Sequence, residues 1–270
     1  WRAMEIKKPH ALVVIDPQND FCDSRGSLYV EGAEDDIERL AAHLVQDGQR
    51  YSDIFVSLDS HDTMAIFHPK FWRDSHGCGP VPFTAITEDD YNRGKWRAAS
   101  DGFGRYAEKM FSVMARKNIP SLVIWPEHCV VSTWGHNLAP RLQEALAAWR
   151  DSSGKPVRYI FKGENPYTEQ FSIFEGLDDS WPGTAFNREL YSRLAGASEV
   201  TFAGEALTHC VEASVTSYIT RCGDIPDGQE IFILSDCSSP VANFDRKSSE
   251  ERLKALGARF TASADLPRDV

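Results

Sequence analysis

Apolar runs alternate with amphipathic stretches along most of the chain. Six short runs rich in β-branched and aromatic residues read as strands, at 10–16, 53–59, 121–126, 157–163, 199–205 and 230–236. Because these runs are almost continuously apolar, they predict strands covered on both faces, as in a parallel sheet. Stretches with helical spacing alternate with them, at 33–48, 100–118, 137–150, 185–196, 209–223 and 246–257. This alternation predicts an α/β fold: a three-layer αβα sandwich around a doubly wound, mostly parallel six-stranded sheet.

Residues 69–90 interrupt this alternation. The segment PKFWRDSHGCGPVPFTAITEDD is rich in proline, glycine and aromatic residues and has no clear period. Loops of this length inside a compact domain are usually lids, binding elements or disordered segments. Because this one carries several aromatic residues, we expect an ordered cover. We expect residues 4–270 to form a single domain.

Composition narrows the classes of partner. The formal net charge of −11 argues against nucleic acid and anionic membranes, both of which require clustered Lys and Arg. We expect no transmembrane helix and no signal peptide, since no apolar run has the required length and position. The six cysteines form no CxxC pair, which favours reduced thiols in a cytoplasmic protein. We also expect a homo-oligomer.

Chemically versatile residues follow five of the expected strands. In open α/β sheets ligands bind at the carboxyl ends of the strands. The residues at these ends are Asp16, Asp59 with His61, His128, Lys162 and the turn from Glu205 to Cys210. An acid, a lysine, a cysteine and a set of metal-ligand types are therefore expected at one edge of the sheet.

Cys210 stands where a strand gives way to a helix. It is either a small buried apolar residue or a nucleophile, because a helix N-terminus, a cation and a nearby base all favour the thiolate. Lys162 can supply the cation, or it can extend from the strand tip toward water. Asp16 can act as the general base, or it can cap the following turn.

Asp59 and His61 are two residues apart, so in an extended segment their side chains point the same way. Such a pair suits a divalent ion such as Zn²⁺, Fe²⁺ or Mn²⁺, although a single D-x-H is a weak motif. Further candidate ligands are His128 and His68.

Five blocks occur in one order along the chain: ALVVIDPQNDFC, SLDSHD, IWPEHCVVSTWGHNL, FKGENPYTEQFSIFEG and GEALTHCV. Together they resemble the nicotinamidase/pyrazinamidase branch of the cysteine hydrolases with the isochorismatase-like fold. The resemblance implies that Asp16 is the base, Lys162 the catalytic lysine and Cys210 the nucleophile. It implies metal ligation by Asp59, His61 and His128, with His68 at the position of a variable fourth ligand.

The resemblance also implies the remaining parts of the site. The Glu205–Ala206 peptide matches a cis peptide, and the N–H groups of Ala206 and Cys210 would form an oxyanion hole. Phe21 and Trp125 match aromatic residues that sandwich a pyridine ring, and Phe171 falls where an aromatic residue is usual. From residue type alone, Trp125 and Phe171 would instead be core residues.

The chain departs from the resembled pattern in two places. Glu205 stands where an aliphatic residue is usual, and Leu207-Thr208 replaces a more polar pair. An insertion of 56 residues, from 69 to 124, separates His68 from Trp125 and would lie over the metal and substrate side.

The resemblance predicts a metal-assisted amidohydrolase. The expected reaction is release of ammonia from nicotinamide or a close analogue through a Cys210 thioester. One alternative is an amidase of the same fold acting on an acyclic amide such as maleamate or on a ureido acid. Another is an isochorismatase proper, whose chemistry does not need the cysteine. A third is a catalytically silent metal-binding scaffold.

Overall fold

The computed structural model describes residues 9–221 and 225–267. Three expectations fall partly outside these residues. They concern Cys222, the end of the expected helix 209–223, and both ends of the expected domain 4–270. The other five cysteines are free thiols. None of the helices in the described ranges has the length and apolar character needed to cross a bilayer.

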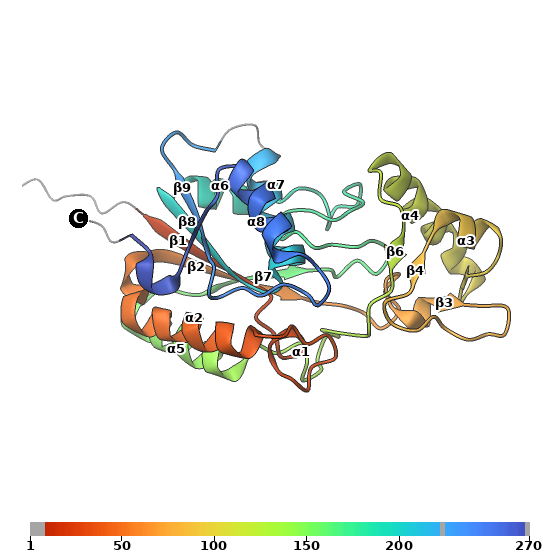
Figure 1. The fold of residues 1–270 in the computed structure, drawn as a ribbon, viewed down its shortest axis with the longest axis horizontal. Helices are drawn as coiled ribbons and strands as arrows, with labels where there is room; N and C mark the ends of the chain where they lie inside the picture. Colours follow the sequence, from red (N-terminus) through yellow and green to blue (C-terminus); the bar gives the residue numbers. More distant parts are fainter. Residues whose placement is uncertain (1–8, 222–224, 268–270) are drawn as a thin grey trace, which may run out of the picture.

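Six parallel strands form the central sheet (Figure 1). Their order is β10-β9-β8-β1-β2-β7, and all five pairings are parallel. The bounds are β1 His10–Ile15, β2 Tyr51–Asp59, β7 Arg158–Lys162, β8 Glu199–Gly204, β9 Glu230–Leu234 and β10 Arg259–Thr261. The central strands β1 and β8 are buried along their whole length, as their continuous apolar sequences predict.

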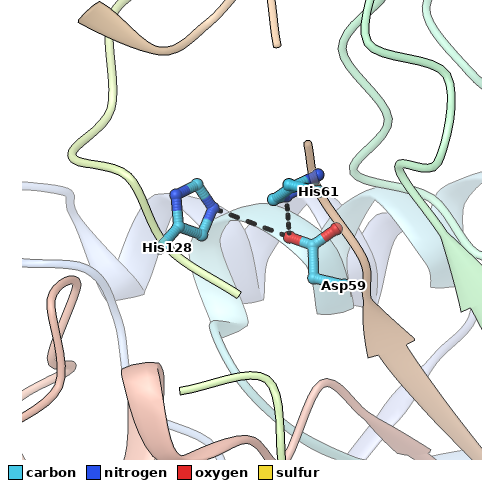
Figure 2. Close-up of side chains that lie close together, drawn as sticks. All are labelled: Asp59, His61 and His128. Atoms are coloured by element: carbon cyan, nitrogen blue, oxygen red, sulfur yellow. Dashed lines mark ion pairs between the residues drawn. The ribbon is translucent and has the colours of Figure 1, made fainter. Parts of the chain in front are cut away.

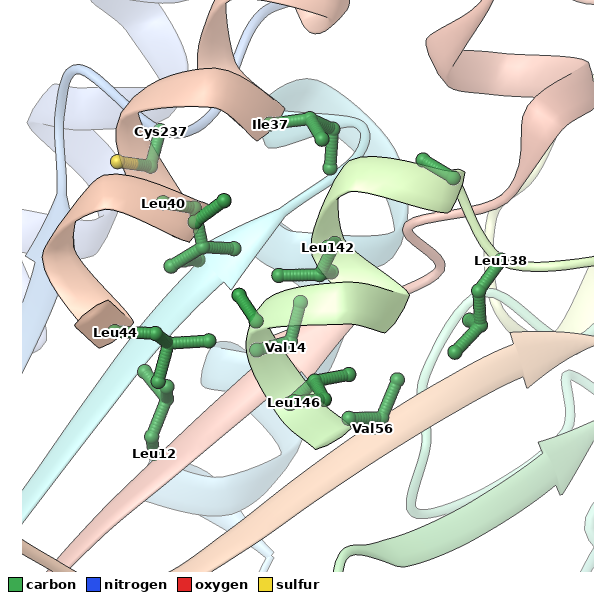
Figure 3. Packing of buried hydrophobic residues seen from close by; sticks show 14 of the residues in the cluster. Leu12, Val14, Ile37, Leu40, Leu44, Val56, Leu138, Leu142, Leu146 and Cys237 are labelled. Carbon is green, nitrogen blue, oxygen red and sulfur yellow. The ribbon is translucent and has the colours of Figure 1, made fainter. Parts of the chain in front are cut away.

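Helices cover both faces of this sheet (Figure 1). On one face lie α2 (Ala33–Asp47) and α5 (Pro140–Ser153), with the short α1 (Asn19–Cys22) beside them. On the other lie α6 (Arg188–Ala195), α7 (Glu212–Thr220) and α8 (Arg246–Ala255). Figure 3 shows how Leu40 of α2 and Leu142 of α5 pack over Val14 of the sheet. The predicted three-layer α/β fold is confirmed.

One predicted strand was wrong and one strand was missed. Residues 121–126 contribute only β6 (Leu122–Val123), which pairs antiparallel with β4 (Ala85–Ile86), outside the central sheet. Their apolar character comes from burial in a separate cluster with residues of the inserted segment. The sixth strand of the sheet is β10, a short edge strand whose partial exposure leaves no apolar run to recognise.

The segment from 69 to 124 is ordered and has its own small core. It contains β3 (Trp72–Arg73) paired with β5 (Arg97–Ala98), together with α3 (Glu88–Asn92) and α4 (Gly104–Arg116). Figure 1 shows this group at one end of the molecule. Buried residues of this core include Phe67, Phe71, Trp72, Ile86, Met110 and Phe111. Single 3₁₀ turns lie at Gly48–Arg50, Pro69–Phe71, Asp101–Phe103 and Ser263–Asp265.

Candidate active site

Three strand ends bring the candidate catalytic residues together. Asp16 directly follows β1, Lys162 is the last residue of β7, and Cys210 lies in a π-helical turn, Leu207–Val211, between β8 and α7. Since β8, β1, β2 and β7 are consecutive in the sheet, the three side chains meet at its carboxyl edge.

Lys162 lies at the centre of this group. Its Nζ is 2.9 Å from Oδ2 of Asp16, 2.9 Å from Oδ1 of Asp59 and 3.6 Å from Sγ of Cys210. Burial alone would lower the pKa of Lys162, but the two carboxylates outweigh it and hold that pKa well above its usual range. The lysine is therefore a fixed cation between the two acids and the thiol.

Cys210 rests as a thiol in this arrangement. Burial raises the pKa of Cys210 well above its usual range against the opposing effect of Lys162, and the Asp16 carboxylate, with an oxygen within 4.8 Å of Sγ, raises this pKa further. Burial likewise raises the pKa of Asp16, whereas Lys162 lowers it. A carboxylate close to a thiol, with a lysine that contacts both groups, is suited to general-base activation of a nucleophile.

Asp16 is held in an uncommon backbone conformation. Its φ is 42°, in the left-handed region that non-glycine residues rarely adopt. The Ser57 hydroxyl holds it there: it accepts from the Asp16 N–H at 3.0 Å and donates to Oδ1 at 2.5 Å. Residues held in such conformations cluster at functional sites.

Asp59, His61 and His128 form the group best suited to a metal ion. One ligand atom from each lies within 4.8 Å of the others, and all three side chains are buried. Nε2 of His61 is 3.0 Å, and Nε2 of His128 3.7 Å, from the same carboxylate oxygen, Oδ2 of Asp59 (Figure 2).

The donors in this group fit a divalent cation. Nδ1 of His61 faces the Gly163 carbonyl at 3.1 Å, and Nδ1 of His128 faces the Pro126 carbonyl at 2.8 Å. Such outer contacts fix the tautomer that leaves Nε2 free for a metal. Burial also lowers the pKa of His128, which keeps this imidazole neutral as ligation requires.

His68 does not join the group. Its Nε2 lies 3.4 Å from Nδ1 of His128, on the side of that ring away from Asp59, and its Nδ1 faces the Asp62 carbonyl. Burial lowers the pKa of His68 to about 2, so the ring is neutral. The ring of His68 thus lies on the far side of His128 from Asp59.

A pocket opens directly above Cys210. It is lined by Phe21, Leu28, Val30, Asp59, Trp125, His128, Glu169, Phe171, Ala206, His209, Cys210 and Val241. All three aromatic residues expected from the sequence, Phe21, Trp125 and Phe171, therefore line the same pocket as Cys210. Trp125 is also partly a core residue, because its ring packs within the cluster of the inserted segment.

Two polar residues of this pocket, Glu169 and His209, were not anticipated. Glu169 is buried, accepts a hydrogen bond from Nε1 of Trp125 at 3.1 Å, and has its pKa raised to about 7, chiefly by burial. The ring of His209 contacts Trp125, Phe171 and Phe244, and burial lowers its pKa to about 4. Only their nearness in sequence to Lys162 and Cys210 could have indicated them.

The turn before Cys210 forms part of the pocket wall. The Glu205–Ala206 peptide is cis, as expected from the resemblance. Among the described residues, the Ala206 N–H donates to no protein acceptor, and both Ala206 and Cys210 line the pocket. Its position fits the expected oxyanion hole.

Gly163 makes room for the metal group. Its φ is +75°, and a Cβ added there would lie 2.4 Å from Cε1 of His61 and 2.8 Å from Oδ1 of Asp59. Glycine is therefore required at this position for two reasons: the backbone has a positive φ, and a Cβ atom would clash with His61 and Asp59.

No family model matches the chain, but individual relatives match it over most of its length. It is 25% identical to the nicotinamidase of Saccharomyces cerevisiae, over 86% of this chain and 88% of that protein. It is 26% identical to the nicotinamidase/pyrazinamidase of Mycobacterium tuberculosis, over 95% and 97%. The chain is thus similar to nicotinamidases over most of its length.

Solved structures of nicotinamidases share the fold. The yeast nicotinamidase superposes with a TM-score of 0.65 at 23% identity, over 93% of this chain and 99% of that one. The same enzyme bound to the inhibitor nicotinaldehyde gives 0.64 at 22%, over 94% and 99%. The pyrazinamidase of Pyrococcus horikoshii in complex with zinc gives 0.55 at 20%, over 94% and 98%.

Proposed function

We propose that this protein is an amidohydrolase that converts nicotinamide to nicotinate and ammonia. The proposal rests on one observation: Cys210, Asp16 and Lys162 lie together at the carboxyl edge of the sheet, next to an aromatic pocket. The nicotinamidase relatives support the choice of substrate, as does the yeast enzyme bound to nicotinaldehyde.

In the first half of the reaction, Asp16 takes the proton from the Cys210 thiol, and the thiolate attacks the carboxamide carbon. Negative charge then develops on the amide oxygen, where the N–H groups of Ala206 and Cys210 stabilise it. The protonated Asp16 donates its proton to the nitrogen, the C–N bond breaks, and ammonia leaves a thioester on Cys210.

In the second half, water replaces ammonia beside Asp16. The carboxylate takes a proton from this water as it attacks the thioester carbon. The C–S bond breaks, and the proton returns to Cys210 as the acid is released. Lys162 keeps the charge of the site balanced throughout, because its ammonium group touches both Asp16 and the sulfur.

Asp59, His61 and His128 would hold a divalent ion, for which we propose zinc. Two imidazoles and a carboxylate are typical zinc donors, and three protein ligands leave positions open. The zinc complex of the Pyrococcus relative supports this choice. When bound, the ion supplies a Lewis acid toward which a ring nitrogen of the substrate can be oriented.

The aromatic pocket favours a flat ring over an acyclic amide. Phe21, Trp125 and Phe171 offer apolar surface, with Glu169 as a polar group beside them. The inserted segment packs against this wall, because the ring of Phe83 lies 6.0 Å from that of Trp125. This contact supports the expectation that residues 69–124 lie over the substrate side.

The test is an ammonia-release assay on the zinc-loaded protein with nicotinamide, pyrazinamide, maleamate and a ureido acid. We expect turnover of the two aromatic amides with kcat/KM at least tenfold above that of the acyclic compounds. Activity confined to maleamate or the ureido acid would replace nicotinamide with an acyclic substrate. Absence of ammonia release from all four would contradict an amidase.

A further inference from the structure

Glu205 is a completely buried acid that the reaction above does not use. It directly precedes Ala206, which lines the pocket and whose N–H has no protein acceptor among the described residues. One of its carboxyl oxygens, Oε2, accepts from the Ser239 N–H at 3.2 Å, whereas Oε1 has no partner among the described residues. A buried oxygen without a partner costs stability unless a proton is shared with it.

Asp36 of α2 also has a buried carboxyl oxygen without a hydrogen-bond partner in the described ranges. Its Oδ1 accepts from Arg39 at 2.6 Å, and its Oδ2 is buried with no partner among the described residues. The side chains of Glu205 and Asp36 are hydrogen-bonding neighbours. Two ionised carboxylates have no donor between them, but one proton on Glu205 supplies a donor and satisfies both orphan oxygens.

The surroundings favour this protonated form. Burial, and next the Asp36 carboxylate, raise the pKa of Glu205 well above its usual range, while Arg246 of α8 acts in the other direction. Cys22 of α1 also faces Glu205, and it rests as a neutral thiol because burial raises its pKa.

The same region of backbone is held from a second side. The Gly204 N–H donates to the Cys237 carbonyl at 2.9 Å, and the Leu207 N–H donates to the Ser239 carbonyl at 2.8 Å. Glu205 connects this loop, through Ser239, to helix α2, through Asp36. The turn that carries the Ala206 N–H is thereby held between this loop and helix α2.

We propose that Glu205, by donating a proton to Asp36, is a positioning residue that holds the Ala206 N–H in the oxyanion hole. This inference rests on the proposed amidase function. An oxyanion donor acts mainly on the transition state, so its displacement lowers kcat and leaves KM almost unchanged. Asp36 does not line the pocket, so any effect of its substitution on kcat reports on the turn.

The test compares the kinetics of nicotinamide hydrolysis in four variants, well below their melting temperatures. Glu205→Gln keeps a neutral donor to Asp36 and an acceptor for Ser239, and we expect kcat within twofold of wild type. Glu205→Met removes both, and Asp36→Leu removes the acceptor; each is expected to lower kcat at least tenfold with KM within twofold. The double variant Glu205→Met/Asp36→Leu leaves no buried charge unpaired and is expected to recover most of that loss.

Glu199→Gln is the matched control. Glu199 is another buried acid, but it is the first residue of β8 and pairs with Arg50 at the end of the strand away from the site. Its substitution is expected to lower the melting temperature and leave kcat within twofold. Wild-type kcat in both Glu205→Met and Asp36→Leu, or a Gln variant as slow as Met, would overturn the inference. A wild type that releases no ammonia from nicotinamide would instead contradict the proposed function.

Discussion

The ammonium group of Lys162 lies 2.9 Å from Oδ2 of Asp16, and both side chains are completely buried. The same nitrogen contacts Oδ1 of Asp59 at the same distance. One cation therefore compensates two buried acids, one from the catalytic group and one from the metal group. This shared contact explains why the nucleophile and the candidate metal ligands lie at a single edge of the sheet.

Replacing Lys162 by Met is expected to be costly for stability as well as for activity. Removing one partner of a buried ion pair typically costs about 3–5 kcal/mol, because the remaining charge is left without compensation. Denaturant unfolding should show a loss of this size, and ammonia release should be abolished. Lys155→Met, at an exposed position, is the control, with an expected change within about 0.5 kcal/mol. Equal stability of the two variants would contradict the role of Lys162.

Substitution of different histidines should reduce bound zinc to different extents. His61→Ala and His128→Ala should each lose bound zinc when the metal content is measured after dialysis, whereas the wild type should retain one ion per chain. His68→Ala should retain the ion with an affinity about 10–100-fold lower, as is typical for supporting residues. His43→Ala, which removes a buried histidine bonded to Tyr51, should not change the metal content. Loss of stoichiometric zinc in His68→Ala would make His68 a ligand.

Substituting two glycines in turn distinguishes the effect of a steric clash from the effect of a left-handed backbone conformation. Gly163 and Gly154 have φ values of +75° and +69°, but a Cβ at Gly154 would meet nothing within 4 Å. Gly154→Ala should therefore cost about 1–2 kcal/mol of stability for the left-handed conformation alone and leave activity intact. Gly163→Ala should in addition displace His61 and abolish both zinc binding and ammonia release. Similar activity in the two variants would contradict the close packing at Gly163.

The Glu205–Asp36 pair predicts how stability depends on pH. The pKa of Glu205 is raised in the fold, so the folded state binds the proton more tightly than the unfolded chain. The stabilisation is complete below the unfolded pKa of about 4.5 and is lost as pH rises toward the folded value, by about 1.4 kcal/mol per pH unit. The free energy of unfolding of wild type minus that of Glu205→Gln should therefore fall as pH rises above about 4.5. A difference that is constant or rises with pH would contradict a protonated Glu205.

Much of this site was predictable because the residues follow strands. Asp16 and Lys162 end apolar runs, and parallel strands bring their carboxyl ends to one edge. The same reasoning failed for residues 121–126, because an apolar run does not reveal which core buries it. It also missed β10, whose half-exposed residues carry no periodic signal.

The remaining features depend on contacts between distant segments. Glu169 lies in an irregular loop after β7, where no periodicity indicates which side chain turns inward. The sequence marked Glu205 as unusual but could not show its partner, because Asp36 lies on a helix far away along the chain. His68 was expected as a ligand from its residue type, and only the orientation of its ring places it behind His128.

The central claim is that Cys210 is the nucleophile of a nicotinamide amidohydrolase. The direct measurement is the rate of ammonia release from nicotinamide by wild type, Cys210→Ala and Cys78→Ala, the last removing an exposed free thiol as control. We expect turnover by wild type and Cys78→Ala and no release above background by Cys210→Ala, whose fold and zinc content should be unchanged. Near-normal ammonia release by Cys210→Ala would contradict it.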